Sequence, residues 1–288
     1  MKSLILCMLL FASALHAAEP LDLGVMSFNV RFANPLDGVN FWPNRKDLAV
    51  ETIRESGADV IGLQEALHQQ LVDLKKALPG FDWVGVGRDD GKNTGEYSAI
   101  LFNAERLEVE KSGTFWLSET PDKPGVKGWD AACPRVATWG IFKDRKSGGR
   151  FFLINTHLDH QGQVAQLEGV KLIFRRLKEL DPGLPMILTG DFNSVETSPV
   201  IREVLEQKGA PLGLAKNLSS DHNFGGNSTF TGFGKAKDPQ VIDFIFVSDG
   251  VKVGKYRYLV KTKGDVFVSD HWPVFTSLRL PTEKTGQN

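Results

Sequence analysis

The sequence predicts an α/β fold in which two mixed β-sheets pack face to face and helices cover their outer sides, a four-layer α-β-β-α sandwich. Three observations lead to this prediction. Short apolar runs of strand type alternate with amphipathic helical runs. A helix-bearing stretch with strands after it occurs twice, and no segment rich in Pro, Gly or Ser separates the halves. The chain has 288 residues and is 41% hydrophobic, enough for one large domain, which we place at residues 19–288.

The first half of the mature chain predicts strands and helices in alternation. Residues Gly24–Phe32 alternate as a strand does, and Arg45–Ser56 carries apolar residues near helical spacing. A second strand is expected at Ala58–Glu65, and a helix at His68–Leu78 that ends at a Pro-Gly pair. Further strands are expected on either side of a charged turn at 87–95 and around a hairpin turn at 145–149, at residues 81–87, 96–102, 136–144 and 149–158.

The second half of the chain again predicts strands and helices in alternation. Gly162–Leu180 is the strongest helical segment, with its apolar residues on one face. Pro199–Gln207 predicts a short helix with proline near its first turn. Strands are expected at residues 185–193, 241–250, 251–260 and 274–280.

The N-terminal segment predicts a cleavable signal peptide at residues 1–18. Lys2 supplies a positive charge, and the apolar run Leu4–Ala14 after it is too short to span a bilayer. Small residues then offer a cleavage site. Removing this segment leaves Cys133 without a second cysteine, so we expect no intrachain disulfide. The segment predicts a secreted or periplasmic protein.

The charge balance restricts the partners. The formal net charge is −1, so there is no broad basic field that would bind nucleic-acid backbones. Nucleic acid is therefore not indicated as a partner, although a local basic patch stays open. No other run is long and apolar enough to cross a membrane, so we expect no stable membrane association. We expect a monomer.

Polar residues stand at the ends of several predicted strands. The segment Phe267–Phe275 places Asp270 and His271 side by side in an otherwise apolar run. Burying such groups alone is costly, so they are either paired or used. If the sheets bring their strand ends together, these residues form one cluster of carboxylates, amides and imidazoles: Asn29, Glu65, Asn155, His157, Asp191, Asn193, Asp243, Asp270 and His271.

Such a cluster suits a hard cation. Oxygen ligands from Glu65, Asp270 and the Asn29 amide are the kind that Mg²⁺ prefers, and Mn²⁺ accepts the same donors. Zinc is disfavoured, because Cys133 is alone and no Cys/His spacing of the zinc kind occurs. A phosphoryl group bound at the metal would need further donors, and a water nucleophile would need a base.

Six short motifs carry a family resemblance. In order along the chain they read SFNVR, LQE, NTHLD, GDFN, IDFIF and SDHWPV. Each motif alone is weak, but in this order they closely resemble the endonuclease/exonuclease/phosphatase superfamily, from Val25 to Leu280. Four further segments resemble a narrower branch of secreted bacterial members, at residues 87–91, 114–122, 127–135 and 158–162.

The resemblance implies a role for each position of the cluster. Glu65 and Asn29 would hold the catalytic metal, with Asp270 close to it. His157 would donate to the phosphate and stabilise the charge that develops in the transition state. Asn193 would place the attacking water or the phosphate.

The same resemblance implies an acid–base pair. Asp191 would orient or deprotonate the attacking water. His271 would be the second acid or base, or a phosphate contact, and Asp243 would hold its imidazole in one tautomer. Which of Asp191 and His271 is the base stays open.

Five residues near the motifs are candidates for substrate contact, with surface ion pairs or packing as equal alternatives: Arg31, Tyr97, Arg135, Asp159 and His160. The charged turn at 87–95 is expected to be a solvated loop.

The sequence therefore predicts a divalent-metal-dependent hydrolase of phosphate esters, a phosphodiesterase or nuclease or a phosphatase, that uses metal-assisted attack of water on phosphorus. The alternative is a binding module of the same fold that holds a phosphate ligand without turnover. The substrate stays open between nucleic acids, phospholipids, sugar or inositol phosphates and nucleotides.

Overall fold

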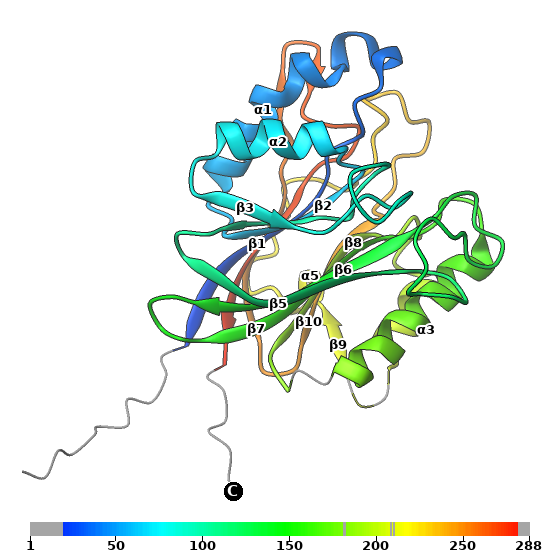
Figure 1. Ribbon diagram of the computed structural model, residues 1–288. Helices are drawn as coiled ribbons and strands as arrows, with labels where there is room; N and C mark the ends of the chain where they lie inside the picture. Colours follow the sequence, from blue (N-terminus) through cyan, green and yellow to red (C-terminus); the bar gives the residue numbers. More distant parts are fainter. Residues whose placement is uncertain (1–19, 181–182, 208, 210, 282–288) are drawn as a thin grey trace, which may run out of the picture.

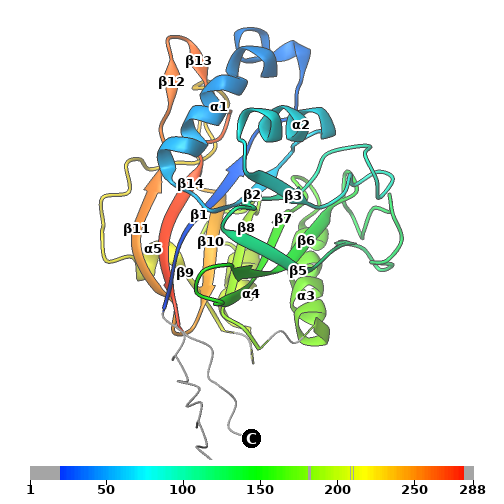
Figure 2. The same ribbon diagram turned by 60° about the vertical axis from the view of Figure 1, so that its left-hand side comes forward.

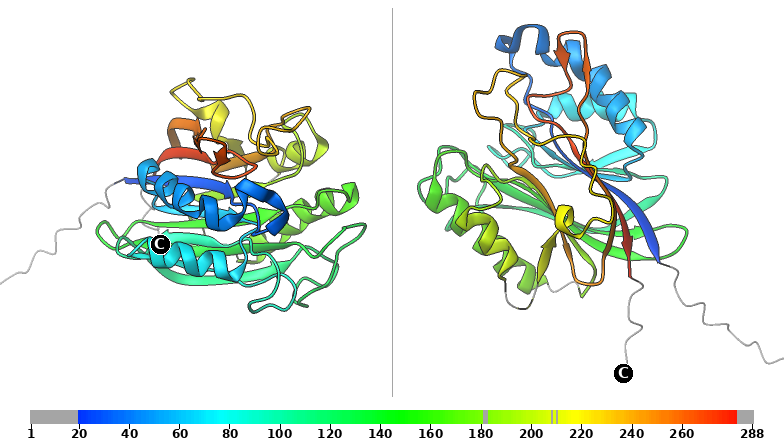
Figure 3. Two further views of the ribbon diagram at one scale, coloured as in Figure 1. Left: turned by 90° about the horizontal axis from the view of Figure 1, so that it is seen from above. Right: turned by 180° about the vertical axis from the view of Figure 1, so that it is seen from behind.

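The computed structural model describes residues 20–180, 183–207, 209 and 211–281. Two six-stranded sheets pack face to face, with helices on their outer sides (Figure 1). From behind, α1 (Trp42–Ser56) and α2 (His68–Ala77) lie over one sheet, and α3 (Gln163–Leu180) and α4 (Pro199–Leu205) over the other (Figure 3). The predicted four-layer sandwich is confirmed. The expected signal peptide, residues 1–18, lies outside the described residues.

The first sheet consists, in spatial order, of β11 (Lys252–Tyr258), β14 (Val274–Leu280), β1 (Leu21–Asn29), β2 (Val60–Gln64), β4 (Ile100–Asn103) and β3 (Phe81–Val84). Only β1 and β2 run parallel; the other neighbours are antiparallel. Figure 2 shows β11, β14 and β1 side by side. The central strand β1 is buried from Val25 to Asn29, because a sheet faces it on one side and helices on the other.

The second sheet has a matching arrangement. Its spatial order is β5 (Leu107–Trp116), β6 (Val136–Asp144), β7 (Arg150–His157), β8 (Met186–Asp191), β10 (Asp243–Ser248) and β9 (Leu212–Leu214). Here β7 and β8 are the parallel pair. Each sheet therefore has one parallel pair near its centre. This agrees with the sequence, in which a helix-bearing stretch with strands after it occurs twice.

Some elements differ from the sequence prediction. The edge strand β5 is not predicted, because charged, exposed residues interrupt its alternation. The short elements η1 (Pro35–Asn40), α5 (Ala215–Leu218), β12 (Thr262–Lys263) and β13 (Val266–Phe267) are too brief to show a period. The other predicted helices and strands are present, with ends shifted by a few residues.

The segment with Asp270 and His271 is a loop. β13 ends at Phe267, and β14 begins only at Val274. The backbone groups between them bond to another loop: Thr231 N donates to Asp270 O at 2.8 Å, and Trp272 N donates to Thr229 O at 2.8 Å. The local pattern cannot reveal this, because the partners lie about 40 residues upstream.

Asn155 on β7 joins the two sheets at their centre. Its buried amide donates to Leu63 O at 2.8 Å and Ala99 O at 2.9 Å on the facing sheet. Its oxygen accepts from Gln64 Nε2 at 2.7 Å. The sheets approach closely here because Gly62 has no side chain: a Cβ on it would lie 2.5 Å from Asn155 Oδ1.

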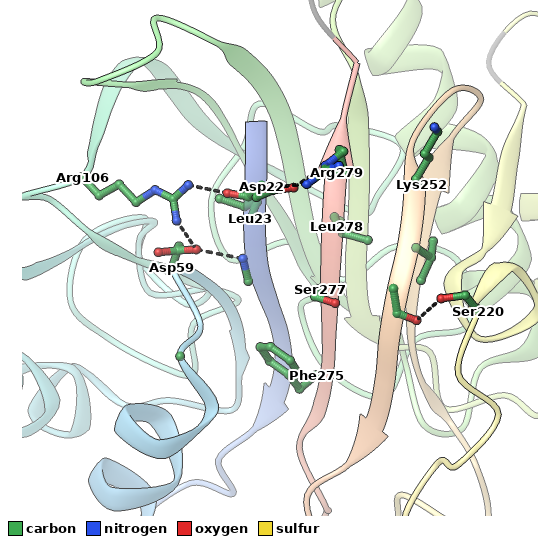
Figure 4. Close-up of a pocket in the computed structure, with 14 residues that line it drawn as sticks. Asp22, Leu23, Asp59, Arg106, Ser220, Lys252, Phe275, Ser277, Leu278 and Arg279 are labelled. Atoms are coloured by element: carbon green, nitrogen blue, oxygen red, sulfur yellow. Dashed lines mark hydrogen bonds and ion pairs between the residues drawn. The ribbon is translucent and has the colours of Figure 1, made fainter. Parts of the chain in front are cut away.

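The opposite end of β1 carries an ion-pair network. Asp59 accepts from Gly24 N at 2.8 Å and pairs with Arg106 at 2.6 Å (Figure 4). Asp22 pairs with Arg279 at 2.7 Å. A groove of about 640 Å³ runs here, and these paired charges, strand residues and Lys252 line it. Among the described residues, no helix is both long and apolar enough to cross a membrane.

Candidate active site

The predicted polar cluster converges at one edge of the sandwich, because both parallel strand pairs end there. Asn29 ends β1, and Glu65 follows the parallel strand β2. His157 ends β7 and Asp191 ends β8, and the two are direct cross-strand partners. Asp243 begins β10 opposite Asp191. The carboxyl ends of parallel strands commonly form ligand sites, since side chains from several strands meet there.

A cavity of about 310 Å³ opens at this edge, within the range of small-molecule sites. Side chains from both sheets and from the connecting loops line it: Arg31, Phe32, Glu65, Arg88, Glu96, Cys133, Arg135, His157, His160, Asp191, Asn193, Phe230, Ile242, Asp270 and His271.

His271 lies between two buried carboxylates. Its Nδ1 is 2.8 Å from Asp243 Oδ2, and its Nε2 is 3.7 Å from Asp191 Oδ2. Burial acts to lower the pKa of His271, but Asp243 and Asp191 outweigh it and hold this pKa well above its usual value. Burial and Asp243 raise the pKa of Asp191 to about 7, although His271 opposes them. The protonation states of His271 and Asp191 therefore depend on each other.

These three groups also form one candidate metal cluster, since ligand atoms of Asp191, Asp243 and His271 lie within 4.8 Å of one another. The Asp243 hydrogen bond and the raised pKa of His271 both favour its protonated form, however. A protonated imidazole is no metal ligand. The arrangement therefore suits proton transfer better than ligation.

His157 and Asn193 form a second group of donors. Asn193 Nδ2 donates to Leu158 O at 3.0 Å and lies 3.0 Å from His157 Nε2. Burial lowers the pKa of His157 well below its usual value, and the nearby Arg135 lowers it further. His157 is thus neutral, and its buried Nδ1 has no hydrogen-bond partner among the described residues.

Asn29, expected as a metal ligand, orients two carboxylates of the site. Its Nδ2 donates to Asp191 Oδ2 at 2.9 Å and to Glu65 Oε1 at 3.1 Å. Its Oδ1 accepts from the backbone N–H of Arg31 at 2.9 Å. Because a backbone N–H can only donate, the amide oxygen must face Arg31 and the nitrogen must face the two carboxylates.

Glu65 and Asp270 fit a hard divalent cation. Both line the cavity and both approach Arg31: Nη1 lies 3.8 Å from Glu65 Oε2, and Nε lies 3.7 Å from Asp270 Oδ2. Arg31 is closer to Asp37, at 3.1 Å, so it neutralises the pair only in part. Burial raises the pKa of Asp270, and Glu65 raises it further against the effect of His271. Two converging, partly uncompensated carboxylates are the donor set such a cation needs.

Three residues of the site have strained backbones. Arg31, Glu65 and Asn193 have φ of 55°, 63° and 47°, values that non-glycine residues rarely adopt. Each directly follows or lies two residues after a strand that ends at the site. Such strain persists only where the surroundings impose it, and it concentrates at functional sites.

Arg135 and His160 line the cavity, whereas Asp159 and Tyr97 lie behind it. Asp159 is 1% exposed and accepts from the backbone N–H of Gly162 at 2.8 Å and from Arg135 Nε at 3.4 Å. Tyr97 OH donates to a loop carbonyl at 2.8 Å. Both differ from the expected substrate contacts, because their polar atoms are already bonded to the protein.

Arg45 is a site residue that the sequence analysis missed. Its guanidinium is fully buried and donates to Val30 O at 2.5 Å, Arg31 O at 2.7 Å and Val268 O at 3.1 Å. It therefore braces the backbone beside both Asn29 and the loop with Asp270. Burial lowers its pKa to about 10. Arginine on the buried side of an otherwise apolar helix face was the available signal.

Arg88, Glu96 and Phe230 also line the cavity without having been predicted. Arg88 comes from the turn expected to be a solvated loop, and Glu96 is the first residue of the strand predicted after it. Their Nη1 and Oε2 atoms lie 2.6 Å apart. Opposite charges at the two ends of one turn were the available signal for this pair.

A two-sheet sandwich whose parallel strand pairs end in carboxylates, amides and imidazoles around one cavity defines a hydrolase of phosphate esters. The family model described as "Endonuclease/Exonuclease/phosphatase family" matches residues 26–271. The chain belongs to the endonuclease/exonuclease/phosphatase family, as the six motifs predict.

Solved structures of similar proteins agree with this membership. A family member from Bacteroides vulgatus is 38% identical with a TM-score of 0.87, covering 91% of this chain and 100% of that one. A mannosyl-6-phosphatase from Bacteroides thetaiotaomicron is 38% identical with a TM-score of 0.82, covering 89% and 99%. The human Nocturnin catalytic domain shares the fold at 19% identity, with a TM-score of 0.71 and coverage of 90% and 94%.

Proposed function

We propose that this chain hydrolyses phosphate monoesters of small hydroxylated molecules, with Mg²⁺ or Mn²⁺ as cofactor and water as the nucleophile. The observation that carries the proposal is that Glu65, His157, Asp191, Asp270 and His271 all line one small cavity. A compact cavity favours a small ester over a long polymer, whose backbone would need an extended basic groove. The 38% identical relative described as a mannosyl-6-phosphatase supports this class of substrate.

Glu65 and Asp270 would hold the cation, with Asn29 fixing the orientation of Glu65. When bound, the cation supplies Lewis acidity to a phosphoryl oxygen. Arg31, between the two carboxylates, adds a fixed positive charge at the same side of the cavity. It can pair with a phosphoryl oxygen through guanidinium N–H groups that the carboxylates leave free.

Asp191 and His271 divide the proton transfers between them. Asp191 Oδ1 accepts from Asn193 N at 2.9 Å and Oδ2 from Asn29 at 2.9 Å, so its carboxylate is held in place at the cavity wall. It would accept a proton from the attacking water. His271, held by Asp243, would keep its Nε2 proton directed towards the cavity, where it can donate to a phosphoryl or leaving oxygen.

His157 would stabilise the charge that develops on phosphorus-bound oxygens, and Asn193 would hold the imidazole ring in position for this. His157 is neutral, so it acts as a hydrogen-bond donor and not as a counter-charge. Preorganised donors in a water-poor site are effective because they need no rearrangement during the reaction. The hydrogen bonds from Asn193 to Leu158 and His157 hold both side chains in place beforehand.

Hydrolysis of three esters tests the proposal: phosphate release from mannose 6-phosphate, and p-nitrophenol release from p-nitrophenyl phosphate and bis-p-nitrophenyl phosphate. We expect hydrolysis of the two monoesters with Mg²⁺, a much slower reaction with the diester, and loss of activity with EDTA or in His271→Ala. Activity that survives both EDTA and His271→Ala would contradict the mechanism. Faster hydrolysis of the diester would contradict the substrate class, and tight binding without turnover would favour a binding module.

We further propose that residues 1–18 direct export and that the mature protein is a monomer. Expression of the full chain in a bacterium tests both points. N-terminal sequencing of the protein from the periplasm or medium should begin after Ala17 or Ala18. Light scattering should give the mass of one mature chain. Retention of the full chain in the cytoplasm, or a dimer mass, would contradict the respective proposal.

A further inference from the structure

We infer that Arg88, Glu96 and Arg135 form a specificity subsite that binds neighbouring hydroxyl groups on the organic part of the substrate. This inference rests on the proposed function and deepens it. The three side chains line the same cavity as Glu65 and His157 but take no part in the proposed chemistry. They would explain how the site distinguishes a sugar phosphate from another small phosphate monoester.

Arg88 and Glu96 form a planar, two-pronged ion pair. Arg88 Nη1 and Nη2 donate to the two Glu96 oxygens at 2.6 and 2.8 Å. The side chains are only 14% and 18% exposed. Such a fork-on-fork pair is geometrically specific, and each carboxylate oxygen keeps a lone pair for a further hydrogen bond. Arg88 Nε has no hydrogen-bond partner among the described residues.

The loop that carries this pair is held rigidly. Arg88 N donates to Glu96 O at 3.1 Å, which closes the turn. Trp116 Nε1 donates to Arg88 O at 2.6 Å, and Tyr97 OH donates to Lys92 O at 2.8 Å. Two aromatic residues from the core thus fix the turn from behind. These buried hydrogen bonds keep the turn in one conformation, which a preorganised binding group requires and an ordinary surface loop does not.

Arg135 supplies a donor that the protein leaves unsatisfied. Its Nε lies 3.4 Å from Asp159 Oδ2, and its Nη2 lies 3.0 Å from His160 Nδ1. Its Nη1 has no hydrogen-bond partner among the described residues, although Arg135 is only 5% exposed. A buried charged donor without a partner is costly, so its retention points to a ligand atom that satisfies it.

The charges favour hydroxyl groups over a second phosphate. Arg88 is neutralised by Glu96, and Arg135 by Asp159, so the subsite carries little net charge. Burial and Glu65 raise the pKa of Glu96 to about 7 against the effect of Arg88, so above this pH the Glu96 carboxylate would moreover repel an anion. A hydroxyl group both donates and accepts, and two neighbouring hydroxyls match a carboxylate acceptor beside guanidinium donors. The sugar ring of a sugar phosphate presents such pairs.

The test compares mannose 6-phosphate with p-nitrophenyl phosphate, which has no hydroxyl groups, in the mature protein with Mg²⁺. Glu96→Gln removes the charged acceptor, and Arg88→Lys removes the fork but keeps the charge. Lys92→Gln, an exposed change on the same loop, is the matched control. We expect the ratio of kcat/KM for the sugar ester over the aryl ester to fall about 30-fold in the first two variants, mostly through KM, because a charged hydrogen bond is lost. The aryl ester and the control should change by less than about threefold.

Equal losses on both esters would overturn the inference, because Glu96 would then act in folding or chemistry. An unchanged ratio would overturn it as well. In the wild type, cyclohexylmethyl phosphate, a ring without hydroxyls, should be at least about tenfold poorer than mannose 6-phosphate; equal rates would contradict the inference even if the variants do not fold. If the wild type hydrolyses the aryl ester but does not prefer mannose 6-phosphate to cyclohexylmethyl phosphate, only this inference is contradicted. If the wild type hydrolyses none of the monoesters, both the proposed function and this inference are contradicted.

Discussion

His271 Nδ1 lies 2.8 Å from Asp243 Oδ2, and both side chains are almost completely buried. Thr229 connects the two segments: its hydroxyl accepts from Asp243 N at 3.2 Å, and its carbonyl accepts from Trp272 N at 2.8 Å. The pair is thus fixed through both backbones. This leaves the opposite ring nitrogen of His271 towards Asp191 and the cavity, with its protonation set by two carboxylates.

Asp243→Asn tests this pairing. The amide keeps the shape but removes the charge, so the imidazole loses its partner and we expect kcat to fall about 100-fold with little change in KM. Steady-state kinetics on p-nitrophenyl phosphate measure this. Asp249→Asn, an exposed change in the turn directly after the same strand, should leave kcat unchanged. A variant with wild-type kcat would show that Asp243 does not position the histidine.

Glu65→Gln tests the cation site apart from catalysis. Because even outer partners of a metal site cost about 10–100-fold in affinity, loss of a direct carboxylate ligand should weaken Mn²⁺ binding by about 100-fold or more. Electron paramagnetic resonance titration of free Mn²⁺ reads this out without substrate. Asp22→Asn, an exposed carboxylate at the other end of β1, is the control. Equal Mn²⁺ affinity in the Glu65 variant would place the cation elsewhere.

Arg45→Met tests the brace behind the site. The methionine fills part of the space but removes the donor that Arg45 supplies to the carbonyls of Asn40, Val30 and Val268, whereas Arg31 O keeps its hydrogen bond from Gln70. Each buried unsatisfied group costs about 1–3 kcal/mol, so we expect the free energy of unfolding to fall by about 4 kcal/mol. Urea denaturation measures it. Lys46→Met on the same helix should change stability by less than about 1 kcal/mol; similar losses in both variants would argue against the brace.

Gly62→Ala tests the close approach of the two sheets. The new Cβ would lie 2.2 Å from Thr189 Oγ1 and 2.5 Å from Asn155 Oδ1, and Asn155 is held by four hydrogen bonds to its neighbours. We expect a loss of about 1–3 kcal/mol by denaturant unfolding, typical of overpacking. Gly169→Ala in α3 meets only ordinary contacts at 3.4 Å, so it should be neutral or stabilising. The same sign for both would refute the steric account.

The lowered pKa of Asp159 predicts that its carboxylate stabilises the fold and that this stabilisation is lost in acid. Burial acts to raise its pKa, but the N–H groups of Gly162, Gln161 and Ala132 outweigh it and lower the pKa to about 2. A carboxyl whose pKa is lower in the folded state stabilises the fold at pH above the unfolded value, 3.8. This contribution, about 2 kcal/mol, is lost as the pH falls from about 4 to about 2. Asp159→Asn should be less stable at pH 7 and lose less stability over this range; parallel pH profiles would contradict it.

Much of the fold follows from local patterns. The strand alternation of Gly24–Phe32 and the helical spacing of Gly162–Leu180 depend only on residues close in sequence, so they appear in the structure nearly as predicted. The order of the six motifs likewise indicated the family and which residues would gather at one edge. Both kinds of pattern depend only on the type and position of residues along the chain, so they can be recognised without knowing which residues are in contact in the fold.

The direction of each side chain depends on atoms from distant segments. The nitrogen of the Asn29 amide faces the carboxylates because the amide oxygen accepts from Arg31 N–H. Asp159 does not line the cavity, because its carboxylate accepts from backbone N–H groups of two loops, at Ala132 and at Gly162. Arg45 acquires its position only when the segment after β1 and the loop with Asp270 come together, and Trp116 of β5 holds the backbone of Arg88 in the Arg88–Glu96 pair. Sequence patterns thus reveal which groups meet, whereas packing and hydrogen-bond partners across the fold determine which of them face the substrate.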